Sequence, residues 1–120
     1  MKMEALIMTN RKHYKPLLIE SVKVPVDIEQ QRFIGFDGNY CAENKKALGV
    51  CDVATEKEQL APVAVFGILL VEAGGTIAVG DSVASDSEGK AVTTSDATAV
   101  NGYALDSATA GQVIRIARGI

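Results

Sequence analysis

Short apolar stretches alternate along the chain with polar, glycine-rich turns, and this pattern predicts β-strands. Nowhere do apolar residues keep helical spacing over ten residues, whereas β-branched residues are frequent in the apolar stretches. The predicted strands span residues 17–26, 31–36, 40–42, 47–53, 61–72, 82–85, 90–93, 99–105 and 112–117. Residues 55–59 are a charged connection with room for one helical turn. Short strands separated by Gly-rich turns at this spacing are typical of an all-β barrel or sandwich.

The most apolar stretch, residues 61–72, suits a central strand, and Gly67 in its middle predicts a bulge or a sharp bend. Asp37-Gly38-Asn39 predicts a tight hairpin turn, because Gly and Asn tolerate positive φ. The predicted core takes its side chains from the strands: Val65, Phe66, Ile68, Leu70, Val83, Val100, Leu105, Val113, Ile114 and Ile116. Because neighbouring strand residues point to opposite faces, some of these must instead contact a neighbouring molecule.

Two parts of the chain resemble each other at an offset of about fifty residues. Each reads as a hairpin, a strand centred on Gly and a final apolar strand that ends at Gly. Gly49 matches Gly102, Gly67 matches Gly119, and Asp37 and Asp86 occupy the corresponding hairpin turns. The match predicts two similar three-stranded units that pack face to face, because neither can bury its apolar side alone.

Length and charge set the domain organisation. A length of 120 residues allows one domain with its own core, and a net charge of −3 argues against a dedicated nucleic-acid-binding protein. Residues 1–16 hold four cations and one carboxylate, so they carry +3 and residues 17–120 carry −6. The longest apolar run is too short to cross a bilayer, and we expect no signal peptide. We therefore predict an extended N-terminal arm, residues 1–16, and a single all-β domain, residues 17–120.

Candidate catalytic and metal-binding motifs are scarce. Gly75–Ser82 has the spacing of a phosphate-binding loop, but Asp81 stands where such a loop needs Lys, and two turns explain the stretch better. His13 is the single histidine and falls in the arm. Cys41 and Cys51 lack further zinc ligands, and we expect them to be free, buried thiols. The sequence therefore predicts no catalytic residues, no metal, no cofactor and no enzymatic activity.

A second interpretation comes from the stretch between Glu72 and Val83, which is similar to the hairpins of biotinyl and lipoyl carrier domains. Those domains are flattened β-barrels of two similar halves, and they need an exposed Lys at a hairpin tip. Lys90 is the candidate for that role, although no Met precedes it as in biotinyl domains. A carrier domain, or another small β-barrel binding module, is therefore the alternative interpretation.

The order of the motifs resembles one known family. The stretches ALGVCDV (47–53), PVAVFGILLVEAGGTIAVGDSVASDSEGKAV (62–92) and VNGYALDSATAGQVIRIAR (100–118) are similar to the capsid cement, or head decoration, proteins of tailed bacteriophages. The resemblance covers about residues 30–118 and depends on the order of the motifs more than on any one of them.

The resemblance implies a non-enzymatic virion structural protein that binds the outer surface of the assembled capsid and stabilises the shell of the major capsid protein. It also implies a homo-oligomer, with a trimer favoured over a dimer, and gives no nucleic-acid or membrane partner. The expected location is the capsid outer surface of the virion, and the host cytoplasm during assembly.

We expect the arm to contact the capsid or a neighbouring subunit. Its contact residues are the apolar or aromatic Met3, Leu6, Ile7, Met8 and Tyr14 and the cationic Lys2, Arg11, Lys12 and Lys15. Burial of the apolar side chains alone falls short of the entropy cost of ordering sixteen residues, so Glu4–Thr9 is expected to add as a strand to a neighbour's sheet edge. The alternative is that Met3–Met8 forms the first strand of the domain's own barrel.

Overall fold

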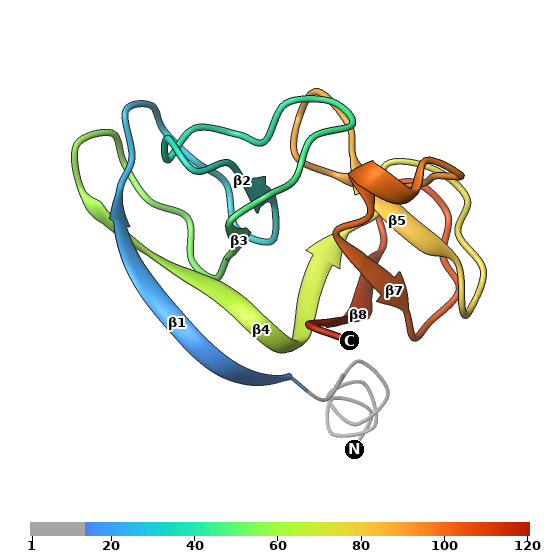
Figure 1. Cartoon of the computed structure of the whole chain (residues 1–120). Coiled ribbons are helices and arrows are strands. Elements are labelled where there is room, and N and C mark those ends of the chain that lie inside the picture. Colours follow the sequence, from blue (N-terminus) through green and yellow to red (C-terminus); the bar gives the residue numbers. More distant parts are fainter. Residues whose placement is uncertain (1–13) are drawn as a thin grey trace, which may run out of the picture.

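The structure of the chain is a computed structural model that describes residues 14–120. Within that range it contains eight strands and one short 3-10 turn (Figure 1). The strands are β1 (Lys15–Lys23), β2 (Phe33–Ile34), β3 (Gly49–Cys51), β4 (Leu60–Glu72), β5 (Ser82–Ser85), β6 (Ala91–Thr93), β7 (Gly102–Ala104) and β8 (Val113–Arg118). The 3-10 turn, η1 (Ala97–Ala99), precedes β7. The predicted all-β class is confirmed.

The strands form one antiparallel sheet that curls into a nearly closed barrel. Its hydrogen-bonded order is β2-β3-β4-β8-β7-β5-β6, and β1 pairs with β4 beside this path. β4 runs through both halves of the barrel, because its first half pairs with β3 and its second half pairs with β8 (Figure 1). The pair β4–β8 therefore joins the two halves into one domain.

Gly67 marks the point where β4 bends. Its φ is +114°, a conformation that L-residues rarely adopt. A Cβ at this position would also collide with the carbonyl oxygen of Lys15 in the adjacent β1. The bend that the sequence predicts is thus confirmed, and it lets one strand pass from the first half of the barrel to the second (Figure 1).

Turns shorten several strands relative to the prediction. The return strand expected at residues 40–42 is reduced to a single bridge between Ile34 and Tyr40. Residues 57–58 form a turn in which Glu58 has φ of +72°, which excludes the helical turn allowed for residues 55–59. The turn at Glu58 depends on the backbone of one residue, which strand-scale periodicity does not reveal.

The strand expected at residues 99–105 begins only at Gly102. The preceding residues form η1 instead, and the Asp96 carboxylate caps it by accepting a hydrogen bond from the Thr98 backbone N–H. An Asp side chain that accepts a hydrogen bond from a nearby backbone N–H offers an alternative to strand pairing, which explains the late start of β7.

The predicted core is correct in four positions, Val65, Val83, Ile114 and Ile116, which are buried. The prediction is wrong for Phe66, which is exposed. The other five predicted core residues are only half-buried: Ile68, Leu70, Val100, Leu105 and Val113. In the second half of β4, after Gly67, the buried side chains belong to odd-numbered positions, so Leu69 and Val71 fill the core in place of Ile68 and Leu70. Further fully buried side chains come from Phe33, Ile34, Val50, Val63 and Ile77.

The predicted repeat appears in the hydrogen bonds of the two halves. In the first half, the backbone N–H of Cys51 donates to the Arg32 carbonyl, and that of Asp52 donates to the Pro62 carbonyl. In the second half, the backbone N–H of Ala104 donates to the Asp81 carbonyl, and that of Leu105 donates to the Arg115 carbonyl. The bridge between Ile28 and Thr55 corresponds in the same way to the bridge between Ile77 and Ala108. The two units join edge to edge through β4 and β8, and the curl of the sheet brings their apolar faces over a shared core.

Candidate interaction surfaces

β1 is an exposed edge strand. It pairs with β4 on one side, and no described residue pairs with its other side. Leu17, Leu18 and Ile19 are 82%, 47% and 45% exposed, so apolar side chains point outward on both of its faces. Long apolar edge strands are sites at which another chain can add, and natural proteins usually cover them.

An apolar groove lies at the bend of β4, between β1 on one edge of that strand and β8 on the other. Ile68 of β4 pairs with Lys15 of β1 and also with Ala117 of β8, so the two strands flank β4 at this point. The groove has a volume of about 570 Å³, and its apolar walls come from Leu17, Leu18, Phe66, Ile68, Ala117 and Ile120. We call it the apolar groove. Gly67, at the bend of β4, also lines it.

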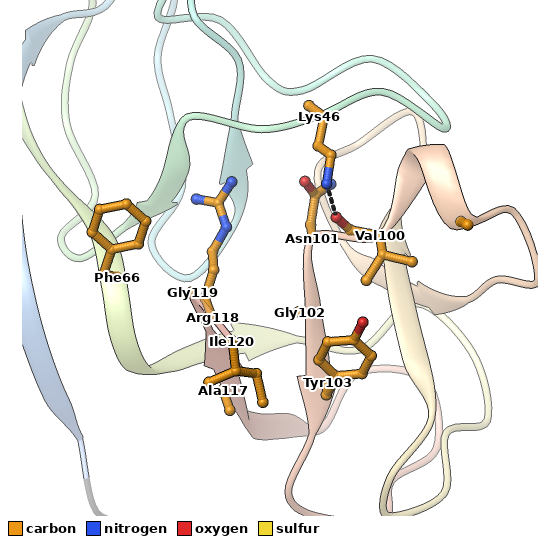
Figure 2. Close-up of a pocket in the computed structure, with 11 residues that line it drawn as sticks. Lys46, Phe66, Val100, Asn101, Gly102, Tyr103, Ala117, Arg118, Gly119 and Ile120 are labelled. Carbon is orange, nitrogen blue, oxygen red and sulfur yellow. Dashed lines mark hydrogen bonds between the residues drawn. The ribbon is translucent and has the colours of Figure 1, made fainter.

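A second hollow adjoins the apolar groove and has a different chemistry (Figure 2). Its volume is about 280 Å³, and Lys46, Asn101, Tyr103 and Arg118 supply its polar lining. Lys46 donates to the Val100 carbonyl oxygen at 2.7 Å. No carboxylate side chain lines it, so we call it the cationic hollow.

Arg118 is held in place by backbone carbonyls of the first unit. Its guanidinium donates to Leu48 at 2.6 Å, to Val65 at 3.2 Å and, more closely, to Ala47. Burial lowers the pKa of Arg118, because desolvation penalises the charged form. The last strand of the second unit is thereby fastened to the loop before β3, and a positive charge is fixed beside the cationic hollow.

Arg32 makes a comparable connection on another part of the barrel. It donates to the Glu72 carboxylate at 3.2 Å, to the Glu29 carboxylate at 3.3 Å and to the Glu88 carbonyl at 3.2 Å. Its guanidinium also lies 5.9 Å from the ring centroid of Tyr40. All these contacts are internal, so Arg32 fastens the two units and is not an open binding residue.

Lys90 belongs to the same network, which bears on the carrier-domain interpretation. Its Nζ lies 3.4 Å from the Glu88 carboxylate and 3.7 Å from that of Glu72, and its side chain is 25% exposed. A carrier lysine has to be free at its hairpin tip, whereas Lys90 is paired and largely covered. This geometry disfavours the carrier alternative.

Two of the predicted arm residues lie in the described part of the chain. Tyr14 packs against the main core cluster, and Lys15 begins β1 with an exposed side chain. Pro16 also belongs to β1, so the last three residues assigned to the arm are part of the folded domain. The other arm residues lie outside the described residues: Lys2, Met3, Leu6, Ile7, Met8, Arg11 and Lys12.

The remaining motifs take structural roles. Asp81, in the loop with phosphate-loop spacing, accepts hydrogen bonds from the Ala78 backbone N–H and the Thr93 hydroxyl, as a turn residue does. Cys41 and Cys51 are buried free thiols, and burial raises the pKa of both. Among residues 14–120, no group of three or more metal-ligating side chains comes together, and no helix is long and apolar enough to span a membrane.

The interaction surfaces were only partly visible in the sequence. The exposed apolar residues of β1 read as buried strand positions, and Lys46 and Arg118 are distant in sequence and carry no shared motif. The one available signal for Arg118 was its place at the end of an alternating strand, next to the Gly119 that matches Gly67. Its contacts with carbonyls of another strand's loop depend on the closed barrel.

Comparison with known proteins gives a family match and matches to solved structures. The model of a family described as phage cement protein matches residues 18–120. A solved structure, the N-terminal base of the head fiber protein gp8.5 of bacteriophage phi29, is similar in fold with a TM-score of 0.75. The two are 23% identical in sequence, and the match covers 85% of this chain and 93% of that one. No curated protein sequence matches the chain.

Proposed function

The chain belongs to the phage cement protein family, and from this premise we propose that it binds the outer surface of an assembled phage capsid and stabilises the shell of the major capsid protein. Membership of this family indicates a structural role in the virion. The single observation that carries the proposal is the family match, which extends over residues 18–120 and therefore over nearly the whole described domain.

The surface of the domain supports a role in binding another protein. The apolar groove and the exposed side of β1 place Leu17, Phe66 and Ile120 in solvent at 82%, 45% and 87% exposure. Contiguous apolar surface of this kind marks interaction sites in soluble proteins. We also propose that this function is non-enzymatic, because the residues considered for chemistry take structural places: Asp81 holds a turn, and Cys41 and Cys51 are buried.

The finer parts of the proposal concern assembly. We propose a homo-oligomer on the shell, with a trimer favoured over a dimer, and synthesis in the host cytoplasm before attachment. The contact residues predicted in the arm remain part of this proposal. Because Lys15 and Pro16 belong to β1, the arm is best tested by deleting residues 1–13 and leaving the domain intact.

The test is co-sedimentation of the purified protein with shells assembled from the major capsid protein of the same phage. We expect saturable binding, and we expect decorated shells to disassemble at a higher temperature or denaturant concentration than bare shells. Absence of binding to mature shells would contradict the proposal. Binding that leaves shell stability unchanged would contradict the stabilising role and leave attachment in place.

The carrier alternative has its own readout. Modification of Lys90 by biotin or lipoate would appear as a mass increase in the protein purified from cells that contain the modifying enzymes. We expect the unmodified mass, because Lys90 is paired with Glu72 and Glu88.

A further inference from the structure

We infer that the cationic hollow and the apolar groove form one docking site, and that it receives an acidic loop of the capsid shell protein in which an apolar side chain stands beside the carboxylate. This inference rests on the proposed function. It assigns the shell-binding contact to a defined part of the folded domain, separate from the N-terminal arm.

The two hollows are continuous with each other. Their walls share residues at the end of β8 and at the bend of β4: Phe66, Ala117, Arg118, Gly119 and Ile120. Figure 2 shows Phe66 and Arg118 on one side of the cationic hollow and Tyr103 and Asn101 on the other. A single loop of a partner can therefore place one side chain in each hollow.

The chemistry of the cationic hollow selects a carboxylate. Lys46 and Arg118 make hydrogen bonds to backbone carbonyls, and no described carboxylate pairs with either of them. Carbonyl oxygens satisfy these donors without neutralising their charge. A lysine ammonium has three N–H donors, so Lys46 keeps donors for a ligand after its bond to Val100. A carboxylate that enters the hollow supplies the missing negative charge and a charge-assisted hydrogen bond.

The apolar groove selects the neighbouring side chain. Leu17 and Ile120 are 82% and 87% exposed, and Phe66 lies between the two hollows as part of both walls. Covering these side chains is favourable in proportion to the apolar area removed from water. A nucleic-acid backbone would match the cations and leave this apolar surface uncovered, which favours a protein partner.

The shell protein is favoured over a second copy of this chain by the charge of the domain. The whole chain carries −3 and residues 17–120 carry −6, so a second copy approaches with a net negative domain and long-range repulsion opposes the contact. Lys46 and Arg118 make the hollow locally positive on a domain whose net charge is negative. They match a partner whose negative charge is concentrated in the docking loop.

The test uses charge reversal with a matched control. Lys46→Glu places a carboxylate in the cationic hollow, and Lys57→Glu makes the same charge change at an exposed lysine outside both hollows. In shell co-sedimentation we expect Lys46→Glu to weaken binding roughly tenfold or more, and Lys57→Glu to bind like the unmodified protein. We also expect the affinity of the unmodified protein to fall as salt rises.

The apolar half has its own pair of variants. Leu17→Ser removes a wall of the groove, and Phe36→Ser removes an equally prominent side chain, 73% exposed, that lines neither hollow. We expect weaker shell binding for Leu17→Ser only. Lys46→Met serves as a second variant in case Lys46→Glu disturbs the fold, and circular dichroism verifies each variant.

The outcomes separate this inference from the proposed function. Unmodified protein that does not sediment with shells overturns both. If the unmodified protein binds shells, and Lys46→Glu and Leu17→Ser bind them as well as their control variants do, the docking site alone is overturned. The docking site is also overturned if Lys46→Glu lowers the mass of the free protein in solution, which would identify a second copy as the occupant. The docking site is overturned, too, if Lys46→Glu loses binding to a DNA oligonucleotide and keeps its binding to shells. That result would identify the hollow as a nucleic-acid site.

Discussion

Gln31 and Gly80 occupy the same position in the two units of the barrel, and both have a left-handed backbone. Their φ angles are +63° and +90°. Gln31 donates its N–H to the Cys51 carbonyl at 2.7 Å, and Gly80 donates to the Ala104 carbonyl at 2.8 Å. The second unit thus uses glycine where the fold requires positive φ, whereas the first unit holds an L-residue there at a cost of about 1–2 kcal/mol.

The first prediction is that Gln31→Gly stabilises the protein. The substitution relieves the left-handed strain, although it also adds conformational entropy to the unfolded chain. We expect a net gain of about 0.5–1 kcal/mol in the free energy of unfolding. The measurement is the midpoint of urea denaturation, followed by fluorescence or circular dichroism.

Gly80→Ala gives the reciprocal test. A Cβ at Gly80 meets nothing within 4 Å, so the expected loss of about 1 kcal/mol comes from backbone strain alone. Gly75→Ala is the control, because its Cβ also meets open space and its φ lies outside the left-handed region. Equal effects of the two alanine substitutions would contradict the strain argument.

The fold class and most strand positions could be predicted because turn chemistry is local. The strand at Ser82–Ser85 matches its prediction to the residue, since Val79-Gly80-Asp81 and Asp86–Gly89 bound it on both sides. The facing of β4 could not be predicted in the same way. Apolar residues occupy both parities of this strand, so alternation carries no signal, and the buried Leu69 reads like the half-buried Leu70.

The interaction surfaces were less predictable for a related reason. Exposure of Leu17, Leu18 and Ile19 follows from the position of β1 at the sheet edge, and edge position is a property of the topology. Lys46 and Arg118 line the same hollow because β8 ends beside the loop before β3, a long-range consequence of barrel closure. No local pattern in the sequence encodes either arrangement.

The second prediction concerns the fastening of the two units. Arg118→Met retains much of the side-chain volume and removes every donor, which leaves the carbonyls of Ala47, Leu48 and Val65 without this partner. We expect a loss of about 2–4 kcal/mol in the free energy of unfolding, because buried acceptors lose charge-assisted bonds. Urea denaturation measures it.

Arg115→Met is the matched control for that substitution. Arg115 pairs with Asp106 at 2.9 Å near the surface of the same strand, where water can replace the lost bond. We expect a smaller shift of the urea midpoint than for Arg118→Met. Equal shifts would show that the carbonyl contacts of Arg118 do not join the units.

The third prediction is a loss of stability at alkaline pH. Burial raises the pKa of Cys41, Cys51 and Tyr14, and the Asp52 carboxylate adds to the effect at Tyr14. Above the ordinary pKa of each group, the unfolded chain releases protons that the folded chain keeps. The folded state then binds more protons, so the free energy of unfolding falls as pH rises above about 8.5, by at most about 1.4 kcal/mol per pH unit for each group.

Tyr14→Phe isolates one of these groups. The Tyr14 hydroxyl has no hydrogen-bond partner of normal geometry among the described residues, so the substitution is expected to keep or raise stability at pH 7. We also expect it to flatten the decline between pH 9 and 11, measured by urea denaturation at several pH values. An unchanged alkaline slope would show that Tyr14 does not titrate with unfolding.

The last prediction separates the surface of β1 from the core of β4. Leu17 is 82% exposed, whereas Leu69 is fully buried in the main core cluster. Leu69→Ala should therefore cost about 2–5 kcal/mol in the free energy of unfolding, through lost burial and a new cavity. Leu17→Ala should change it by less than about 0.5 kcal/mol, because the side chain is already in water.

The two variants diverge again in shell binding. Leu17→Ala should remain folded and sediment less with shells, whereas Leu69→Ala, assayed at a temperature where it stays folded, should bind like the unmodified protein. Each variant is thus expected to change one measurement and not the other, the unfolding midpoint for Leu69→Ala and co-sedimentation for Leu17→Ala. This difference distinguishes a core residue from an interaction residue. A large loss in the free energy of unfolding for Leu17→Ala would contradict this prediction. It would show that the Leu17 side chain stabilises the barrel.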